Sequence, residues 1–354
     1  MQKHCSIIMV NWNGWEDTIE CLETVLKQHY GNYDVVLVDN GSDDQSVERI
    51  KEWANLETSQ IETKFPQLVY PIVDRPVNIE IIKEFNLFKS DRNNSKPVVY
   101  IIQNSENLGF AKANNIAIFF AINILESDYL FLLNNDTVIE KDTVIEKDCL
   151  SKLIEMIEMF SEYSAMQSAI YYYKYPEKIW HVGGRILPWM QTKYYRKIKQ
   201  NEVKQVYFIS GCALFLTRTL INSIGALSEK FFHGEEDFEF SMRLKKNNLK
   251  AAVVQSSKVY HKIETSLSKR WEKDTGRLLN FALNRLINIR SFFPEYKWKI
   301  WAFFTIIYFY QLMVFKYNLP IKYSFNLAKG IYHWSNILDE VRSNDVEHIL
   351  RNIR

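Results

Sequence analysis

Alternation between short apolar runs and amphipathic stretches constrains the fold of this chain more than any other feature. "SIIMVNWNG" predicts a buried strand over 6–10, and "EDTIECLETVLKQ" predicts a helix whose apolar face holds Ile19, Leu22, Val25 and Leu26. "YDVVLVD" and "VERIKEWANL" repeat the strand–helix order over 33–56. Consecutive units of this length favour right-handed βαβ connections and a parallel sheet.

Residues 56–97 interrupt this alternation, because they are polar and contain four prolines. We interpret them as an insertion over the sheet edge that carries a short strand or helix. The alternation then resumes with "VVYIIQN", "AKANNIAIFFAINIL", "YLFLLNND" and "CLSKLIEMIEMF" as strand, helix, strand and helix, the last with Asp148 as its expected N-cap. The sequence therefore predicts an α/β fold with a mainly parallel, twisted sheet flanked by helices.

The hexapeptide "TVIEKD" occurs twice in succession, at 137–142 and 143–148. Six extra residues in a connection cost little closure entropy. We therefore interpret the repeat as a tolerated tandem duplication, with the extra copy forming a longer loop or an added turn. Asp136 precedes both copies, so the duplication leaves it attached to its strand.

Composition excludes some classes of protein. A net charge of +2 gives no reason to expect a nucleic-acid partner. The four cysteines have no CxxC spacing, which favours buried thiols in a reducing compartment. The N-terminal apolar stretch is too short for a signal peptide, so we expect a cytoplasmic protein.

The second half of the sequence is less regular. β-like segments ("SAIYYY", "VYFISGCALFL" and "KAAVVQSSKVYH") surround a helix-like stretch over 235–248, which indicates a mixed half that closes over the strand ends. From 275 the chain is helical, aromatic and basic, and 300–315 has no formal charge. Over 262–330, twelve Lys and Arg stand against four Asp and Glu. A segment lying in a membrane interface, a buried core helix and an oligomer contact all remain open.

Polar residues follow the apolar strands at 11–13, 39–44 and 134–136, and Gly109 marks a tight turn before a helix. In an open parallel sheet, ligands bind beyond the carboxyl ends of the strands. No GxGxxG or GxxxxGK[ST] motif is present, which removes the main support for a dinucleotide or P-loop site. Acidic strand ends instead predict a Mg²⁺ or Mn²⁺ ion holding a phosphate, with Asp136 as its best ligand. Each stretch taken alone could be an ordinary turn.

The stretch "FFHGEEDFEFSMRLKKNN" places acids among phenylalanines. An apolar setting raises a carboxylate pKa and suits a general base, although acids in a first helical turn also favour the helix dipole. Arg243 lies six residues beyond Asp237 on another face, and we assign it to donor binding. His261 follows a β-like run and is either a ligand to metal or phosphate or a structural histidine.

Seven stretches in this order resemble glycosyltransferase family 2, and within it the rhamnosyltransferase-like branch. They are "SIIMVNWNG", "VVLVDNGSDDQSVE", "NSENLGFAKANN", "YLFLLNNDTVIEKD", "ISGCALFLTR", "FFHGEEDFEFSMRL" and "VYHK". The resemblance implies a GT-A fold and inverting, metal-assisted sugar transfer from a nucleoside-diphosphate sugar, dTDP-rhamnose or a UDP-sugar. The implied acceptor is a saccharide or lipid-linked hydroxyl in polysaccharide or glycolipid assembly.

The resemblance also implies roles for individual residues. Glu236 and Asp237 match the family's acidic pair, with Asp237 as the base, and Gly211 lies in the acceptor loop. Asp136 is the metal-binding acid of the DxD position, whose first acid is Asn134 here, and His261 reaches the metal or diphosphate. The implied donor-binding residues are Asn11, Asn13, Asp39, Asn107, Gly109, Phe110, Asn114 and Asn135.

We expect a GT-A domain over 1–265, divided into a donor half (1–148) and an acceptor half (149–265). A helical C-terminal region then follows over 266–354, with a membrane surface as one candidate partner. A nucleotidyltransferase on a similar sheet is an alternative, but it requires a basic, Gly-rich loop where this chain has "NWNGWEDT". An inactive, membrane-docked scaffold of the same fold is a second alternative.

Overall fold

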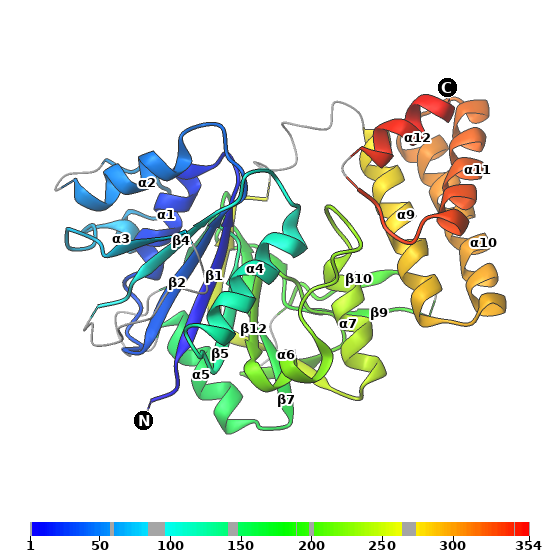
Figure 1. Ribbon diagram of the computed structural model, residues 1–354. Coiled ribbons are helices and arrows are strands. Elements are labelled where there is room, and N and C mark those ends of the chain that lie inside the picture. The colour runs from blue at the N-terminus through cyan, green and yellow to red at the C-terminus, as the bar shows by residue number, and fades with distance from the viewer. Residues whose placement is uncertain are drawn as a thin grey trace.

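The structure is a computed structural model that describes residues 2–56, 60–83, 96–140, 148–188, 190–197, 202–263, 274–342 and 344–353. The first half has the predicted alternation of strands and helices (Figure 1). Its elements are β1 (Cys5–Asn11), α1 (Trp15–Val25), β2 (Tyr33–Asp39), α2 (Ser46–Asn55), β4 (Val99–Gln103), α4 (Phe110–Asn123) and β5 (Tyr129–Leu133). The predicted α/β class is confirmed.

One large sheet runs through the protein in the order β11-β13-β7-β12-β5-β1-β2-β4-β3. Strands β5, β1, β2, β4 and β3 are parallel, and β13 is parallel to β7. Strand β12 is antiparallel to both of its neighbours and joins the two halves. The strands of the second half are β7 (Tyr163–Tyr172), β11 (Val203–Val206), β12 (Ala213–Thr217) and β13 (Lys250–His261).

The predicted insertion carries both a short helix and a short strand. Helix α3 (Pro66–Val69) precedes β3 (Ile79–Ile82), which pairs with β4 at the edge of the sheet. Residues 57–59 and 84–95 of the insertion lie outside the described part of the chain.

Helices cover both faces of the sheet because side chains alternate along each strand. Ile7 and Met9 pack with α1, α2 and α5 (Cys149–Met159), whereas Ile8 packs with α4. Helices α6 (Arg218–Ile224) and α7 (Glu236–Lys246) lie on the same side as α4. All four cysteines are buried and free, as expected.

The first copy of the repeat is a strand. Thr137–Ile139 forms β6, which pairs antiparallel with the end of β13, so that Thr137 lies opposite His261. Asp148 caps α5 as predicted, because its Oδ1 accepts a hydrogen bond from the Ser151 amide at 2.8 Å. Residues 141–147, which include most of the second copy, lie outside the described residues.

The stretch predicted as one β-like run over 206–216 is divided. Strand β11 ends at Val206 and β12 begins at Ala213. Between them, the Ser210 amide donates to Gln167 Oε1 and the Gly211 amide donates to Asp237 Oδ1, both at 2.7 Å. These two amides bind side chains in place of a neighbouring strand, so the chain turns there. Short strands β8 (Ile179–His181), β9 (Gly184–Ile186) and β10 (Thr192–Tyr194) complete this half.

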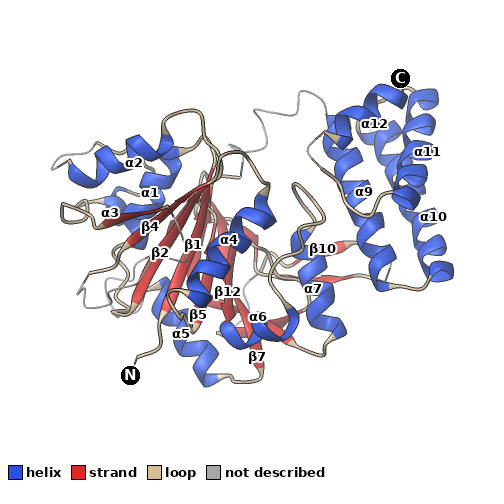
Figure 2. Ribbon diagram, in the orientation of Figure 1, coloured by secondary structure: helices blue, strands red, loops and turns tan. Residues whose placement is uncertain are grey.

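In the described part of the C-terminal region the helices are α9 (Asp274–Phe292), α10 (Glu295–Gln311), α11 (Ile321–Ile337) and α12 (Asp345–Ile353). A π-helical turn, η2 (Leu312–Lys316), continues α10. Figure 2 shows these helices side by side at one end of the molecule, beyond β9 and β10. Their hydrophobic cluster includes Phe208, Phe231, Phe238 and Met242 from the preceding part of the chain. The region predicted to begin at 266 therefore shares a core with the rest of the protein.

Candidate functional site

Strands β5, β1 and β2 are neighbours, and their carboxyl ends meet at one edge of the sheet. Asn11 is fully buried there and donates from Nδ2 to Asp39 Oδ1 at 2.8 Å. Its Oδ1 accepts from the Thr18 hydroxyl at 2.9 Å, and that hydroxyl accepts from Asn135 Nδ2 at 2.9 Å. Three predicted site residues thus form one hydrogen-bonded chain at the point where the strand order changes direction, the usual ligand position in such sheets.

A second series of hydrogen bonds continues this edge, and we call the two series together the donor wall. Asn40 donates from Nδ2 to Asn107 Oδ1 at 3.0 Å, and the same oxygen accepts from the Gly109 amide at 2.9 Å. Gly109 has φ +84°, and a Cβ there would lie 2.4 Å from the carbonyl oxygen of Phe232. Only glycine fits this position, which brings the start of α4 against the second half of the protein.

Two further predicted donor residues lie at the ends of this wall. Asn13 lies at the exposed rim with φ +50°. Its Nδ2 donates to Asp43 Oδ1 at 2.7 Å, and its Oδ1 accepts from the Asp43 backbone amide at 2.9 Å. Asn114 is buried in the first turns of α4 and donates to the carbonyl of Phe110 at 2.9 Å. Asn13 therefore extends this edge, whereas Asn114 bonds within its own helix.

Asp136 and His261, the predicted metal ligands, are in contact. Pairing of β6 with β13 places Asp136 Oδ1 3.0 Å from His261 Nε2. Burial is the largest influence and lowers the pKa of His261, but Asp136 and Cys212 together outweigh it, so the net pKa lies well above the usual 6.5. Asn134 Oδ1 is buried beside this ion pair without a hydrogen-bond partner. Buried polar atoms without partners are rare, so this group fits a cation and the phosphates that it would hold.

The protein supplies few ligands for such an ion. Within the described residues, no group of three or more His, Cys, Asp and Glu side chains is arranged to hold a metal. Mg²⁺ commonly takes one or two carboxylates and completes its shell with phosphate oxygens and water. Asn134 in place of an acid agrees with a site that depends on the diphosphate for much of its coordination.

Asp237, the predicted base, lies in the first turn of α7 and accepts the Gly211 amide at 2.7 Å. A Cβ on Gly211 would lie 2.9 Å from Asp237 Oδ1, so this close approach requires glycine. Burial, then the neighbouring Glu236 carboxylate, raises the pKa of Asp237 well above its ordinary value. Burial followed by Glu235 likewise raises the pKa of Glu236. A carboxylate with a raised pKa is a stronger base at neutral pH.

A single loop, 210–212, connects the base to the metal ligands. Gly211 binds Asp237, and the carbonyl of Cys212 accepts the Asn134 amide at 2.9 Å. The ring of Phe110 lies 3.4 Å from the Cβ position of Gly211. The donor wall, the metal pair and the base therefore converge on this loop.

The sequence reasoning missed several residues of the site. Thr18 and Asn40 connect the donor wall, and an aromatic group borders the metal pair and the base. The Trp180 ring lies 5.2 Å from the His261 ring, and Tyr194 stacks on His181 at 5.1 Å. Burial, followed by the Asp237 carboxylate, raises the pKa of Tyr194 to about 12. In the sequence, Trp180 and His181 lie in the short run "IWHVGG", which has neither a clear helical nor a clear strand period.

Arg243 does not join the site. Its guanidinium binds Glu239, at 2.7 Å from Nη2 to Oε2, and the carbonyls of Ile224 and Gly225 at 2.6 and 3.2 Å. It also lies over the ring of Phe240. These contacts tie α7 to the end of α6, so the assignment of Arg243 to the donor is not supported and we interpret this residue as structural.

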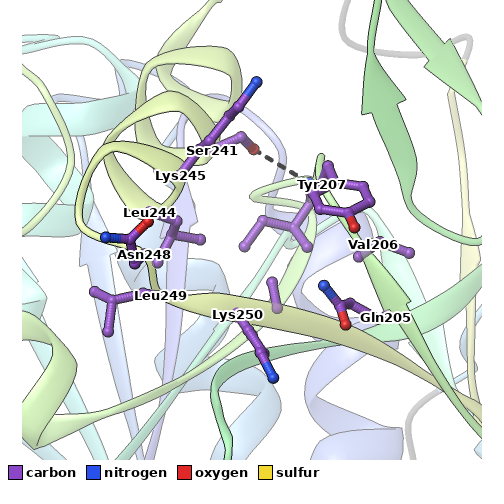
Figure 3. A pocket seen from close by; sticks show the side chains of 11 residues that line it. Gln205, Val206, Tyr207, Ser241, Leu244, Lys245, Asn248, Leu249 and Lys250 are labelled. Atoms are coloured by element: carbon purple, nitrogen blue, oxygen red, sulfur yellow. Dashed lines mark hydrogen bonds between the residues drawn. The ribbon is translucent and has the colours of Figure 1, made fainter.

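A hollow of about 320 Å³ lies at the other end of α7 (Figure 3). Tyr207, Ser241, Lys245 and Lys250 line it, and Figure 3 shows the bond from the Ile209 amide to the Ser241 hydroxyl. None of the predicted site residues lines this hollow. We therefore place the functional site at the strand ends.

Together, the polar edge of the open α/β sheet, the paired Asp136 and His261 and the buried acid define the candidate active site of an α/β enzyme. Comparison with known families agrees with this class. The description "Glycosyl transferase family group 2" matches residues 137–335, more than half of the chain, and "Glycosyl transferase family 2" matches residues 6–65. The chain belongs to glycosyltransferase family 2 and is a glycosyltransferase. No curated protein matches it.

Solved structures of the same fold are distant in sequence. A crystal structure of GalNAc-T7 with UDP, GalNAc and Mn²⁺ aligns with TM-score 0.57 at 15% identity, covering 99% of this chain and 54% of that one. The mannosyltransferase PcManGT from Pyrobaculum calidifontis, with GDP-Man and Mn²⁺, aligns with TM-score 0.51 at 12% identity, covering 99% and 79%. S. aureus TarS 1-349 with UDP-GlcNAc aligns with TM-score 0.51 at 15% identity, covering 99% and 90%. The chain thus spans about half of the GalNAc-T7 chain, and these similarities support the GT-A fold.

Proposed function

We propose that this protein transfers a sugar from a nucleoside-diphosphate sugar to an acceptor hydroxyl with inversion at C1. The observation that carries the proposal is the convergence on loop 210–212, where Gly211 binds the base Asp237 and Cys212 binds the metal-site residue Asn134. A base and a site for the leaving diphosphate that meet at one loop are what a single displacement requires.

The proposed reaction is one displacement step. Asp237 takes the proton from the acceptor hydroxyl, whose oxygen forms a bond to the sugar C1. The bond between C1 and the diphosphate oxygen breaks, and its electron pair leaves with the diphosphate. Asp39, Asn11 and Asn135 orient the nucleotide, and the Gly211 amide holds the carboxylate of Asp237 in place.

Asp136 and His261 would hold the divalent cation, Mg²⁺ or Mn²⁺, and Asn134 lies beside them with a free oxygen. When bound, the cation stabilises the negative charge that develops on the leaving diphosphate. The structures of GalNAc-T7 and PcManGT were both determined with Mn²⁺, which supports this choice of cofactor.

A donor screen by thermal shift tests the proposal directly. A bound donor stabilises the folded protein by mass action, about 2.7 kcal/mol at a hundred times its Kd. We expect a rise in Tm with UDP-, dTDP- or GDP-sugars in the presence of Mn²⁺, and sugar release or transfer with the same donor. Absence of both nucleotide binding and turnover with every donor would contradict the proposal and favour the inactive scaffold. Release of pyrophosphate from a nucleoside triphosphate would favour the nucleotidyltransferase.

The raised pKa of Asp237 predicts the pH dependence of transfer. Asp237 accepts a proton only when ionised, so activity should rise with pH through its raised pKa rather than near the ordinary 3.9. We expect kcat/KM at saturating Mn²⁺ to be low at pH 5 and to increase about tenfold per pH unit below that pKa. A profile that is flat from pH 5 to 8 would contradict the assignment.

We propose dTDP-rhamnose as a first donor to test, because the sequence resembles the rhamnosyltransferase-like branch. We further propose a lipid-linked acceptor in polysaccharide or glycolipid assembly, at a membrane surface. The support for the membrane lies in α10 and α11. Six apolar residues of this region each have more than half of their own surface exposed: Ile300, Phe303, Phe304, Phe315, Ile321 and Phe325.

We call these six residues the apolar face. The four on α10 and η2 recur at helical spacing, so they form one stripe. Five lysines and one glutamate lie in 295–337, a net charge of +4, which suits an anionic lipid surface. By length and composition alone, the 22-residue helix Glu295–Lys316 could also cross a membrane. Neighbouring exposed apolar side chains often mark a protein or membrane contact, and we favour docking on the lipid interface.

Substitution within the apolar face tests membrane docking. We expect Phe303→Glu with Phe304→Glu to weaken binding to phosphatidylcholine–phosphatidylglycerol vesicles by about a hundredfold, because two aromatic side chains no longer enter the lipid. Co-sedimentation measures this change, and transfer to a soluble acceptor should be unaffected. Phe119→Glu, at an exposed phenylalanine on α4, is the matched control. Equal binding by the double variant and the control would contradict docking through this face.

A further inference from the structure

The loop 231–235 leads directly into the acidic pair Glu236 and Asp237, and helix α9 holds its backbone. Asn280 donates to the carbonyl of His233 at 2.9 Å, and Asn288 donates to the carbonyl of Glu235 at 3.1 Å. Asn284 donates to the carbonyl of His233 at 3.2 Å. The three asparagines recur every four residues, so they lie on one face of the helix.

These amides are not explained by packing. Asn284 and Asn288 are fully buried, and each leaves its Oδ1 without a hydrogen-bond partner. An unsatisfied buried polar atom costs about 1–3 kcal/mol, and the bonds from the Nδ2 groups to the loop carbonyls offset this cost. Their benefit is the position that they give to the loop.

Arg285 adds a buried ion pair to this contact. It is 2% exposed, and its Nη2 donates to Glu235 Oε1 at 2.8 Å while its Nε donates to Oε2. Its Nη1 binds the carbonyl of Met190, and its guanidinium lies 3.9 Å from the centre of the Phe238 ring. Glu235 has φ +72°, a conformation that L residues disfavour and that the surrounding contacts must maintain.

The same loop is also attached at its other end. Val341 donates to the carbonyl of Lys230 at 2.7 Å and accepts the amide of Phe232 at 2.9 Å. The carbonyl of Phe232 in turn accepts the Phe110 amide at 3.2 Å and closes against Gly109. The loop therefore lies between the C-terminal helices and the donor wall.

We infer that α9 positions the catalytic base: Arg285 and the three asparagines hold loop 233–235, and thereby set where Asp237 meets Gly211. Arg285 is a positioning residue, since it contacts Glu235 and not the reacting groups. A buried ion pair seldom adds net stability over an apolar pair, so its value here is the geometry. The C-terminal helices are thus part of the active site. This inference rests on the proposed function of Asp237.

The test compares Arg285→Met with Arg290→Met on the same helix. The guanidinium of Arg290 instead donates to the carbonyls of Ser335 and Leu338 and to Asp339, all within the C-terminal region. For Arg285→Met we expect kcat to fall about a hundredfold, the effect of a displacement near 1 Å, with donor Kd changed less than about threefold. Arg290→Met should keep kcat. Arg285→Lys should recover part of the loss, because a charge without the bidentate geometry remains.

Two further variants separate positioning from folding. Glu235→Gln with Arg285→Met removes both charges, so Tm should recover while kcat stays low. If Arg285→Met fails to fold, Asn288→Ala replaces it, with an expected fall in kcat of about tenfold at unchanged donor affinity. Unchanged kcat in folded variants, or equal losses of kcat and donor affinity, would overturn the inference.

Hydrogen exchange makes the result independent of turnover. Amides 236–240 should exchange faster in Arg285→Met than in Arg290→Met, whether or not a donor is known. If the wild-type protein neither transfers nor hydrolyses any sugar nucleotide, the proposed function fails while this comparison still decides what α9 does. Equal exchange in the two variants would contradict the positioning role.

Discussion

Asp237→Asn should reduce sugar transfer by about 10²–10⁴-fold at saturating donor and Mn²⁺, the usual contribution of a general base. Asparagine keeps an oxygen that can accept the Gly211 amide but cannot take a proton from the acceptor. We therefore expect kcat to fall while the Kd of the donor, measured by titration calorimetry, stays within about threefold. Turnover near the wild-type level would show that another group is the base.

The same substitution should stabilise the folded protein, and the gain should depend on pH. The pKa of Asp237 is raised in the folded state, so folding binds a proton that the unfolded chain releases above about pH 3.9. Wild-type stability from this group is present at low pH and is lost as pH rises through the raised pKa. The advantage of Asp237→Asn should therefore be near zero at pH 4 and grow as pH rises toward the raised pKa.

Glu239→Gln is the matched control for both measurements. Glu239 lies on the same helix, but its carboxylate binds Arg243 and not Gly211. Transfer should stay within a few-fold of wild type. The free energy of unfolding should fall slightly, because a partly buried ion pair is lost. A loss of transfer as large as that of Asp237→Asn would mean that any acid on α7 is essential.

Asp136→Asn should cause the second large loss, about 10³-fold in kcat/KM. Asp136 is the carboxylate beside His261, so its removal leaves one charged group fewer to hold the cation. We expect activity to require a much higher Mn²⁺ concentration, and chelation by EDTA to abolish wild-type activity reversibly. Metal titrations of initial rate measure both effects.

Asp74→Asn serves as the control for this prediction, because Asp74 is an exposed acid of the insertion that pairs with Lys96. Its Mn²⁺ dependence should match that of the wild type. If Asp136→Asn also showed wild-type Mn²⁺ dependence, the metal would bind elsewhere, or the leaving group would be stabilised by other residues.

Local features of the sequence predicted much of the first half correctly. The strand ending at Asp39 and the helix capped by Asp148 follow from apolar period and capping chemistry, which depend on neighbouring residues only. The polar residues after β1, β2 and β5 could be found for the same reason. Their hydrogen bonds could not, because Thr18 and Asn40 carry no signal that differs from an ordinary turn or helix residue.

Other features depended on contacts between distant residues. The first "TVIEKD" copy is a strand only because β13 pairs with it, and this pairing brings His261 to Asp136. Arg243 was predicted to bind the donor from its place beyond the acidic pair, but Glu239 and the end of α6 occupy its guanidinium. Register between distant strands and the partner of a long side chain cannot be read from a local pattern.

The sequence alone determined the alternation of strands and helices along the first half of the chain, the polar strand ends and the acidic pair. Each of these depends on residues that are close together in the chain. The tertiary structure alone decided how these features meet. Loop 210–212 joins the base to the metal pair, and Arg285 of α9 binds Glu235, which precedes it by 50 residues in the sequence. These contacts arise because a buried charge or amide must find a partner wherever the fold provides one.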